Sequence, residues 1–91
     1  MSIDLEKRRV QRGKDIIDLT TLEFDLLCVM AENPGQVYSR MQLLDKTQKD
    51  TCEGYERTID VHIKNLRKKI EFDPEHPRVI VTIHGVGYKI A

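Results

Sequence analysis

The chain has 91 residues, of which 40% are hydrophobic and 33% are charged, and 15 basic residues balance 15 acidic residues. This length suits one compact domain with a small core and leaves no room for a second domain. No apolar run approaches the roughly 20 residues that span a bilayer, and residues 1–4 lack the basic and apolar regions of a secretory signal. We therefore expect a single cytoplasmic domain over residues 1–91.

The cysteines and carboxylates predict neither a metal centre nor a catalytic site. Cys28 lies in an apolar run of helical character, as a small core residue would, and Cys52 lies in a polar segment. We expect no disulfide between them in a reducing compartment. No paired carboxylates, nucleophile with a base, or metal-ligand set occurs at a meaningful spacing. The sequence therefore favours a protein that is not an enzyme and has no cofactor.

Charge is distributed unevenly along the chain. Residues 1–14 carry a net charge of +3, residues 15–56 carry −6, and residues 57–91 carry +3. Within the last segment, residues 57–69 contain five basic residues and a single acid, Asp60. The neutral total therefore hides two basic ends, and charge gathered on one face is what a nucleic-acid footprint requires.

Weakly alternating segments at the amino end predict a small antiparallel sheet. Gly13 marks the turn between its second and third strands. The three expected strands are residues 3–5, 9–11 and 16–19.

A central core helix is predicted after this sheet. Thr20 and Glu23 have the spacing of a capping box, in which the hydroxyl and the carboxylate each accept a hydrogen bond from the other residue's backbone amide. Residues 22–30 are apolar around much of a helical circumference. The helix is expected to stop at residues 33–35, Asn-Pro-Gly, because proline lacks the amide donor and glycine tolerates a left-handed backbone.

A short second helix is expected after an extended piece at residues 37–38. Ser39 and Gln42 have the spacing of another capping box, and the helix should continue to about Lys46. Residues 47–55 then form a polar loop.

Residues 56–71 predict an amphipathic helix. At about 100° per residue, four apolar side chains form a core-facing stripe: Ile59, Ile63, Leu66 and Ile70. The opposite side carries Arg57, Val61, Lys64, Asn65 and Lys68. The flanks carry Thr58, Asp60, Arg67 and Lys69. His62 lies toward the flank shared with the core, where a structural role is expected, and Asp60 could orient Arg57 by an ion pair.

The outward side of this helix has the chemistry needed to read DNA. Basic side chains neutralise phosphates, lysine and asparagine hydrogen-bond to base edges in the major groove, and a small apolar side chain packs on a thymine methyl. Val61 is otherwise hard to explain on this side. The alternative is a solvated charged face, which is common on helices; the clustering of positive charge favours the DNA interpretation.

The carboxyl end predicts a β-hairpin over residues 79–90. Val79, Val81 and Ile83 alternate with Ile80, Thr82 and His84, as in a first strand. Gly-Val-Gly at residues 85–87 turns the chain, and residues 88–90 form the second strand. Two helices across a turn, followed by a hairpin, have the order of a winged helix-turn-helix. We therefore predict an α+β winged helix-turn-helix fold with an N-terminal antiparallel sheet, three helices and a C-terminal β-hairpin wing.

An ordered set of short motifs extends over nearly the whole chain. They are Leu19-Thr20, Glu23-Phe24 and Leu26-Leu27, then residues 34–37 with Ser39-Arg40 and Leu43-Leu44, then residues 57–63 and 66–69, and finally Gly85-Val86-Gly87-Tyr88. In this order and at these spacings the set resembles the effector domain of OmpR/PhoB-type response regulators.

This resemblance implies a bacterial transcription factor domain that is not an enzyme, with its third helix in the major groove and its wing toward the adjacent minor groove. It implies base contacts for Val61, Lys64 and Asn65. It implies contacts with the DNA backbone for Arg40, Arg57, Thr58, Arg67, Lys68 and Tyr88. The wing residues that it points to are Thr82 and His84. For Tyr88 the alternative is a ring packed in the core with its hydroxyl in water.

Three places depart from the common pattern of that family. His84 stands where many relatives carry arginine at the wing tip, so its minor-groove contact would depend on protonation, and a solvated histidine is the alternative. Gln48 lies near the position of an aromatic side chain that touches the DNA backbone in relatives. Many relatives carry two arginines at the positions of Lys64 and Asn65. Since asparagine favours adenine and lysine favours guanine, the bases that this chain prefers should differ from those of such relatives.

The resemblance also implies partners outside this chain. The polar loop 47–55 corresponds to the loop through which family members touch RNA polymerase, although a plain connection between helices is the alternative. The exposed charges expected there are Lys49, Asp50 and Glu53. Family members join this domain to a receiver domain, which a sensor kinase system phosphorylates and which drives dimerisation on tandem half-sites of double-stranded DNA. We expect a fragment of such a regulator or, alternatively, an orphan factor; alone it should be monomeric and bind a half-site weakly.

A function from another class is compatible with the same residues. The domain would then be a winged-helix interaction module whose basic helix meets an acidic protein partner. Val61 and the wing distinguish the two functions, because both have a clear use on a DNA duplex.

Overall fold

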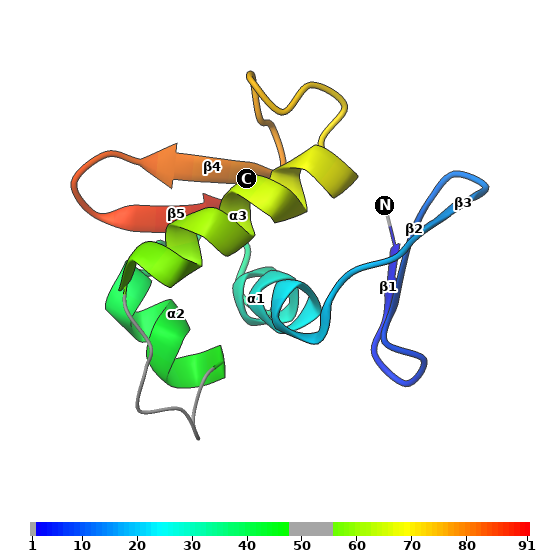
Figure 1. Cartoon of the computed structure of the whole chain (residues 1–91), viewed down its shortest axis with the longest axis horizontal. Coiled ribbons are helices and arrows are strands. Elements are labelled where there is room, and N and C mark those ends of the chain that lie inside the picture. Colours follow the sequence, from blue (N-terminus) through cyan, green and yellow to red (C-terminus); the bar gives the residue numbers. More distant parts are fainter. Residues whose placement is uncertain (1, 48–55) are drawn as a thin grey trace.

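Three helices lie between an amino-terminal sheet and a carboxyl-terminal hairpin in the described parts of the chain (Figure 1). The computed structural model describes residues 2–47 and 56–91, with the backbone alone at residues 56 and 57. The strands are β1 (Ser2–Asp4), β2 (Arg9–Arg12), β3 (Asp15–Ile17), β4 (Ile80–Ile83) and β5 (Gly87–Ile90). The helices are α1 (Thr21–Ala31), α2 (Arg40–Thr47) and α3 (Glu56–Ile70). This order confirms the predicted α+β winged-helix architecture.

The amino-terminal sheet turns one face toward the core. Its strand order is β1-β2-β3, all antiparallel, and Ile3, Val10 and Ile17 lie opposite one another across it. Val10 is fully buried, and the other two pack against the core. Gly13 makes the predicted turn into β3 with a φ of 61°. β3 ends at Ile17 rather than at residue 19, because the chain there extends away from the sheet toward Thr20, which caps α1.

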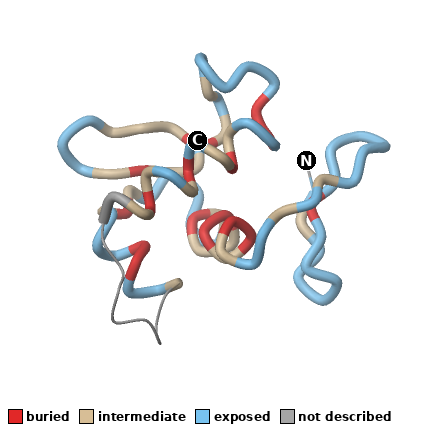
Figure 2. Tube along the Cα trace, in the orientation of Figure 1, coloured by how far each residue is buried: buried red, intermediate tan, exposed pale blue. Residues whose placement is uncertain are grey.

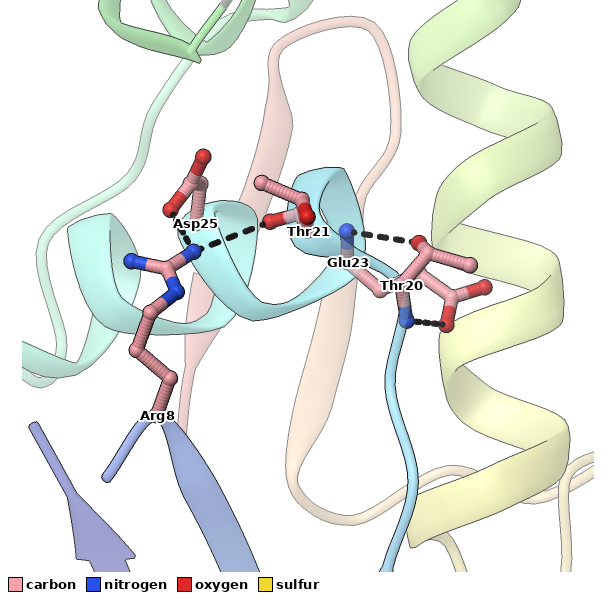
Figure 3. Close-up of polar contacts among 5 residues, drawn as sticks. All are labelled: Arg8, Thr20, Thr21, Glu23 and Asp25. Carbon is pink, nitrogen blue, oxygen red and sulfur yellow. Dashed lines mark hydrogen bonds and ion pairs between the residues drawn. The ribbon is translucent and has the colours of Figure 1, made fainter.

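Arg8 ties the turn between β1 and β2 to the first turns of α1 (Figure 3). Its Nη2 donates hydrogen bonds to Oδ1 of Asp25 at 2.6 Å and to the carbonyl oxygen of Thr21 at 3.4 Å. Its guanidinium carbon lies 4.6 Å from the centroid of the Phe24 ring, within cation–π range. Arg8 has a φ of 50°, in the left-handed region that costs free energy for a residue with a side chain. These contacts join Arg8 to residues 13 to 17 positions later in the chain and stabilise this backbone conformation.

The capping box at the start of α1 is confirmed (Figure 3). The Glu23 amide donates to Oγ1 of Thr20 at 3.2 Å, and the Thr20 amide donates to Oε1 of Glu23 at 3.0 Å. The side chains that α1 buries in the core are Phe24, Leu26, Leu27 and Met30. Cys28 is partly buried against this core, as predicted, and burial raises the pKa of its thiol. The helix ends before the Asn-Pro-Gly segment, where Gly35 has a φ of 88°.

The core lies where α1, α2 and α3 meet (Figure 2). The predicted stripe on α3 is confirmed: Ile59, Ile63, Leu66 and Ile70 are each at most 2% exposed. α2 adds Leu43 and Leu44, and the hairpin adds Ile80 and Tyr88. In the described residues no helix combines the length and the apolar character needed to cross a membrane.

The second capping box and the extended piece before it are also confirmed. The Gln42 amide donates to Oγ of Ser39 at 3.1 Å, and the Ser39 amide donates to Oε1 of Gln42 at 2.8 Å. Tyr38 forms a bridge with Tyr88, in which each backbone amide donates to the other residue's carbonyl, at 2.8 and 2.9 Å. A Cβ on Gly87 would lie 1.9 Å from the carbonyl oxygen of Tyr38, so only glycine fits beside this bridge.

Candidate nucleic-acid interface

The outward side of α3 is open to solvent. α3 runs diagonally across the molecule between the hairpin and α1 (Figure 1). Val61 is 53% exposed, Lys64 and Lys68 are exposed, and Asn65 is partly exposed. These side chains lie opposite the buried stripe, so the predicted division of this helix between a core side and a polar side is confirmed. The result is a projecting cationic ridge that carries one exposed apolar side chain.

Asp60, on the flank of α3, joins three elements of the fold. Its Oδ2 lies 3.0 Å from Nη1 of Arg40 at the start of α2. Its Oδ1 accepts a hydrogen bond of 2.7 Å from the hydroxyl of Tyr88 in β5. The ion pair that the sequence predicts with Arg57 lies outside the described residues, because the side chain of Arg57 is not described. Asp60 therefore holds the start of α2 and the wing against α3.

Tyr88 has its ring in the core and its hydroxyl on a carboxylate. The residue is 9% exposed. Burial and the hydrogen bond with Asp60 together raise the pKa of the Tyr88 hydroxyl to about 12. The sequence-based alternative of a packed ring is thus observed, but the hydroxyl has a protein partner in place of water. The predicted contact with DNA backbone stays a prediction.

Arg67 is bound to the wing strand β4. Its Nε and Nη2 donate to the carbonyl oxygen of Ile80 at 3.2 and 2.9 Å, and Nη2 also donates to Oγ1 of Thr82 at 2.6 Å. Its guanidinium carbon lies 5.4 Å from the centroid of the Tyr88 ring. Sequence reasoning assigned Arg67 to phosphate and did not find this contact. Its position on the flank, next to Leu66 of the stripe, was the available signal that it could also face the protein.

Glu71 is a buried carboxylate that sequence reasoning missed. It is 6% exposed and directly follows the last residue of α3. Its two oxygens accept hydrogen bonds of 2.8 to 3.0 Å from three successive backbone amides, those of Arg78, Val79 and Ile80. Buried carboxylates are uncommon unless they are satisfied in this way, so a glutamate between a stripe residue and a loop was the only local hint.

The wing tip projects into solvent. His84 and Gly85 are exposed, and Val86 is 56% exposed. Gly85 makes the turn with a φ of 78°. The hairpin pairs Ile80 with Ile90 at its base and Ile83 with Gly87 at its tip. β4 begins at Ile80, one residue later than predicted; the Val79 amide is bound by Glu71, and the Val79 carbonyl oxygen accepts from the Ala91 amide at 3.0 Å.

Residues 13–90 match the family model of the transcriptional regulatory protein C-terminal domain. The chain belongs to this family. The predicted OmpR/PhoB-type effector domain is therefore confirmed.

Relatives of this effector domain include full-length response regulators. The chain is 43% identical over 89 residues to the DNA-binding response regulator MtrA of Mycobacterium tuberculosis, covering 98% of this chain and 39% of that protein. It spans about two fifths of the length of the curated relatives that it matches.

Solved structures share the fold. The response regulator DrrB of Thermotoga maritima, an OmpR/PhoB homologue, is 43% identical, with a TM-score of 0.77 over 85% of this chain and 35% of that chain. The DNA-binding domain of RstA from Klebsiella pneumoniae, in complex with the RstA box, is 36% identical, with a TM-score of 0.86 over 98% of this chain and 88% of that chain.

In this effector domain an ion pair also attaches α3 to α1, in addition to the pair between Asp60 of α3 and Arg40 of α2. Nζ of Lys69 lies 2.6 Å from Oε1 of Glu23, which is 2% exposed. Burial by itself raises the pKa of Glu23, but hydrogen bonds from Lys69 and from Thr20 outweigh it and hold the pKa below its ordinary value.

Two further residues of α3 that the sequence analysis names are neither fully buried nor fully exposed. His62 is partly buried, and Thr58 is partly exposed near the amino end of α3.

Several predicted site residues of this effector domain lie outside the described residues. They are Gln48, Lys49, Asp50, Cys52, Glu53 and the side chain of Arg57. Of the predicted loop 47–55, only Thr47 is described, and it ends α2, one residue later than predicted. The RNA polymerase loop therefore stays a prediction.

Proposed function

We propose that this domain binds double-stranded DNA in a sequence-specific way and regulates transcription, with α3 in the major groove and the wing, residues 79–90, toward the adjacent minor groove. One observation carries the proposal: Val61, Lys64 and Asn65 stand on the open side of α3, directly opposite its buried stripe. An α-helix with such a ridge fits the width of a B-DNA major groove. The related RstA domain was solved in complex with the RstA box, which supports DNA binding by this chain.

Base contacts are assigned to the ridge of α3. Val61 would pack on a thymine methyl, Asn65 would bind adenine through two hydrogen bonds, and Lys64 would donate to guanine. Val61 lies about one helical turn before Lys64 and Asn65 on the same side of α3, so the three side chains can meet neighbouring base pairs.

Contacts with the DNA backbone are assigned to residues around that ridge. Lys68 is exposed beside it, and Thr58 is placed near the amino end of α3, whose dipole favours anions. Arg40 stands at the start of α2 and is paired with Asp60, which orients it. Arg57 completes the set, and Arg67 and Tyr88 belong to it as predictions from the resemblance. At the wing, Thr82 and His84 are the proposed contacts.

The whole regulator would supply the remaining partners. A receiver domain controlled by a sensor kinase would drive pairing on tandem half-sites, the loop with Lys49, Asp50 and Glu53 would contact RNA polymerase, and the protein would act in the cytoplasm. The isolated domain should be a monomer that binds a single half-site weakly, since it lacks the avidity of a linked copy.

Selection from random duplex DNA at fixed salt tests this function. We expect the 91-residue domain to enrich one sequence motif, and Lys64→Ala with Asn65→Ala to broaden it. Lys14→Ala is the matched control, because Lys14 is an exposed base in the turn before β3. Uniform retention of all sequences would contradict sequence-specific binding. Binding to acidic protein surfaces without binding to DNA would instead favour an interaction module.

A further inference from the structure

Both backbone polar groups of one wing residue are held by side chains of the α3 segment. Ile80, the first residue of β4, is fully buried. Its amide donates to Oε2 of Glu71 at 2.8 Å. Its carbonyl oxygen accepts two hydrogen bonds from Arg67, at 2.9 and 3.2 Å. We call Arg67 and Glu71 together the Ile80 clamp.

The spacing of the clamp residues sets the geometry. Arg67 and Glu71 are four residues apart, and the Glu71 amide still donates to the Arg67 carbonyl at 2.9 Å, so the helical turn extends through both. Their side chains therefore project from the same side of the helix, one turn apart. Each binds the wing through a planar, two-pronged group, and such groups fix direction as well as distance.

The clamp reaches residues on both sides of Ile80. Glu71 also accepts from the amides of Arg78 and Val79, and Arg67 also donates to Oγ1 of Thr82. An isolated two-stranded hairpin is marginally stable in water. Arg67 and Glu71 therefore attach β4 to the carboxyl-terminal end of α3, whereas the Tyr88 hydroxyl attaches β5 to Asp60 of the same helix.

We propose that Arg67 and Glu71 are positioning residues for DNA recognition: they hold the wing at one angle to α3, so that helix and wing meet neighbouring grooves together. The proposal rests on the proposed function and deepens it. This role of Arg67, through Ile80 and Thr82, replaces the phosphate contact that the resemblance implies for it.

The sign of the effect at Glu71 separates positioning from electrostatics. Removing a negative charge from a DNA-binding domain strengthens binding if charge alone matters, because repulsion from the phosphates falls. Glu71→Gln keeps the size and shape of the side chain, but its NH2 group, a donor, would then face backbone amides that are also donors. We expect it to weaken binding, roughly 2- to 30-fold, as residues do that modulate a site they do not touch. Glu75→Gln, an exposed glutamate in the next loop, is the matched control and should not weaken binding.

Arg67→Lys separates the two roles at the other end of the clamp. Lysine keeps the charge but cannot make the paired bonds to Ile80 and Thr82. A positioning role predicts that Arg67→Lys weakens binding about as much as Arg67→Ala. A phosphate contact predicts that Arg67→Lys stays near the wild type. Lys68→Arg and Lys68→Ala, at the exposed neighbouring position, provide the reference for a plain backbone contact.

The experiment measures dissociation constants for the selected duplex and for a random duplex. Amide hydrogen exchange at Ile80 and the orientation of the wing by residual dipolar couplings are measured in the same variants without DNA. We expect Glu71→Gln and Arg67→Lys to weaken binding and to reorient β4 and β5, with α1 unchanged. If Glu71→Gln does not fold, Glu71→Asp, which keeps the charge but is shorter, takes its place.

The outcomes are distinct. Stronger or equal binding by the Glu71 variant, or wild-type binding by Arg67→Lys, overturns the positioning role. Weaker binding with an unmoved wing also overturns it. If the wild-type domain binds neither duplex, the proposed function itself fails, whatever the wing orientation shows.

Discussion

The hydroxyl of Tyr88 donates a 2.7 Å hydrogen bond to Oδ1 of Asp60, 28 residues earlier in the chain. Because Oδ2 of Asp60 binds Arg40, this carboxylate links the wing, α3 and the start of α2. All three elements carry proposed DNA contacts. Asp60 and the Ile80 clamp therefore both contribute to the relative placement of these elements.

Removal of the Tyr88 hydroxyl should destabilise the domain mainly below alkaline pH. We expect Tyr88→Phe to lower the free energy of unfolding by about 1 to 2 kcal/mol at pH 7, since a hydrogen bond to a charged group is lost. The folded pKa of about 12 lies above the ordinary value of 10.0. The unfolded state therefore releases its proton first as the pH rises, and wild-type stability from this group is complete below pH 10.0 and lost toward about pH 12.

Urea denaturation between neutral pH and pH 11 checks this prediction. The difference in stability between wild type and Tyr88→Phe should shrink as the pH rises. Tyr38→Phe is the matched control, because its hydroxyl accepts a hydrogen bond from the neutral side chain of Asn33. If the difference in stability between wild type and Tyr88→Phe stayed constant up to pH 11, the hydrogen bond from the Tyr88 hydroxyl would not raise its pKa, and the prediction would fail.

Substitution of Gly87 should open the bridge between the wing and the segment before α2. A Cβ would meet three backbone atoms of Tyr38 and Ser39 at 1.9 to 2.9 Å, and backbone atoms cannot rotate away. We expect Gly87→Ala to cost about 3 kcal/mol or more, from overpacking and two lost hydrogen bonds. Gly85→Ala has open space around the new Cβ and only a left-handed φ of 78°, so it should cost about 1 to 2 kcal/mol. Thermal melts of both variants give the comparison; equal losses would refute the close approach.

Acid should weaken the attachment of α1 to α3. The pKa of Glu23 is held below its ordinary value of 4.5, so its contribution is present above that value and is lost as the pH falls through the lower, folded pKa. We expect Glu23→Gln to be less stable than wild type at pH 7 and to lose less stability on acidification. Glu32→Gln, an exposed residue at the end of α1, should follow the wild-type profile. Parallel profiles for Glu23→Gln and wild type would argue against this ion pair.

Base readout by α3 should appear as a loss of discrimination. We expect Lys64→Ala or Asn65→Ala to cost roughly 1 to 3 kcal/mol on the preferred duplex and to relax base choice. Lys68→Ala should weaken all duplexes alike and reduce the slope of log K against log salt by about one unit. Titrations at several salt concentrations measure both. Equal losses on preferred and random duplexes for all three variants would contradict base readout.

Charge reversal in the predicted loop 47–55 should separate activation from DNA binding. In the proposed whole regulator, Asp50→Lys with Glu53→Lys is expected to reduce transcription from a reconstituted promoter while DNA affinity stays unchanged. Asp18→Lys, at an exposed acid before α1, serves as the control. Unchanged transcription by the double variant would remove this loop from the proposed polymerase contact.

Local patterns were sufficient for the elements and for the two sides of α3. The capping boxes at Thr20 and Ser39 involve residues three apart, so their spacing alone predicted both helix starts. The stripe on α3 follows from helical periodicity, which also defines the opposite, outward side. For the same reason the ridge of Val61, Lys64 and Asn65 could be predicted before any tertiary contact was known.

Contacts between distant segments were decided only by the tertiary structure. Arg67 and Asp60 lie on the flanks of α3, where periodicity assigns a side chain neither to the core nor to solvent. Packing of the hairpin places Ile80 and Tyr88 within hydrogen-bond distance of them. The burial of Glu71 also depends on packing of the hairpin. A buried carboxylate needs hydrogen-bond donors, and the hairpin segment supplies them as backbone amides. Sequence therefore determined which side of α3 is cationic and open to solvent, whereas the angle between helix and wing depends on hydrogen bonds that exist only after the chain has folded.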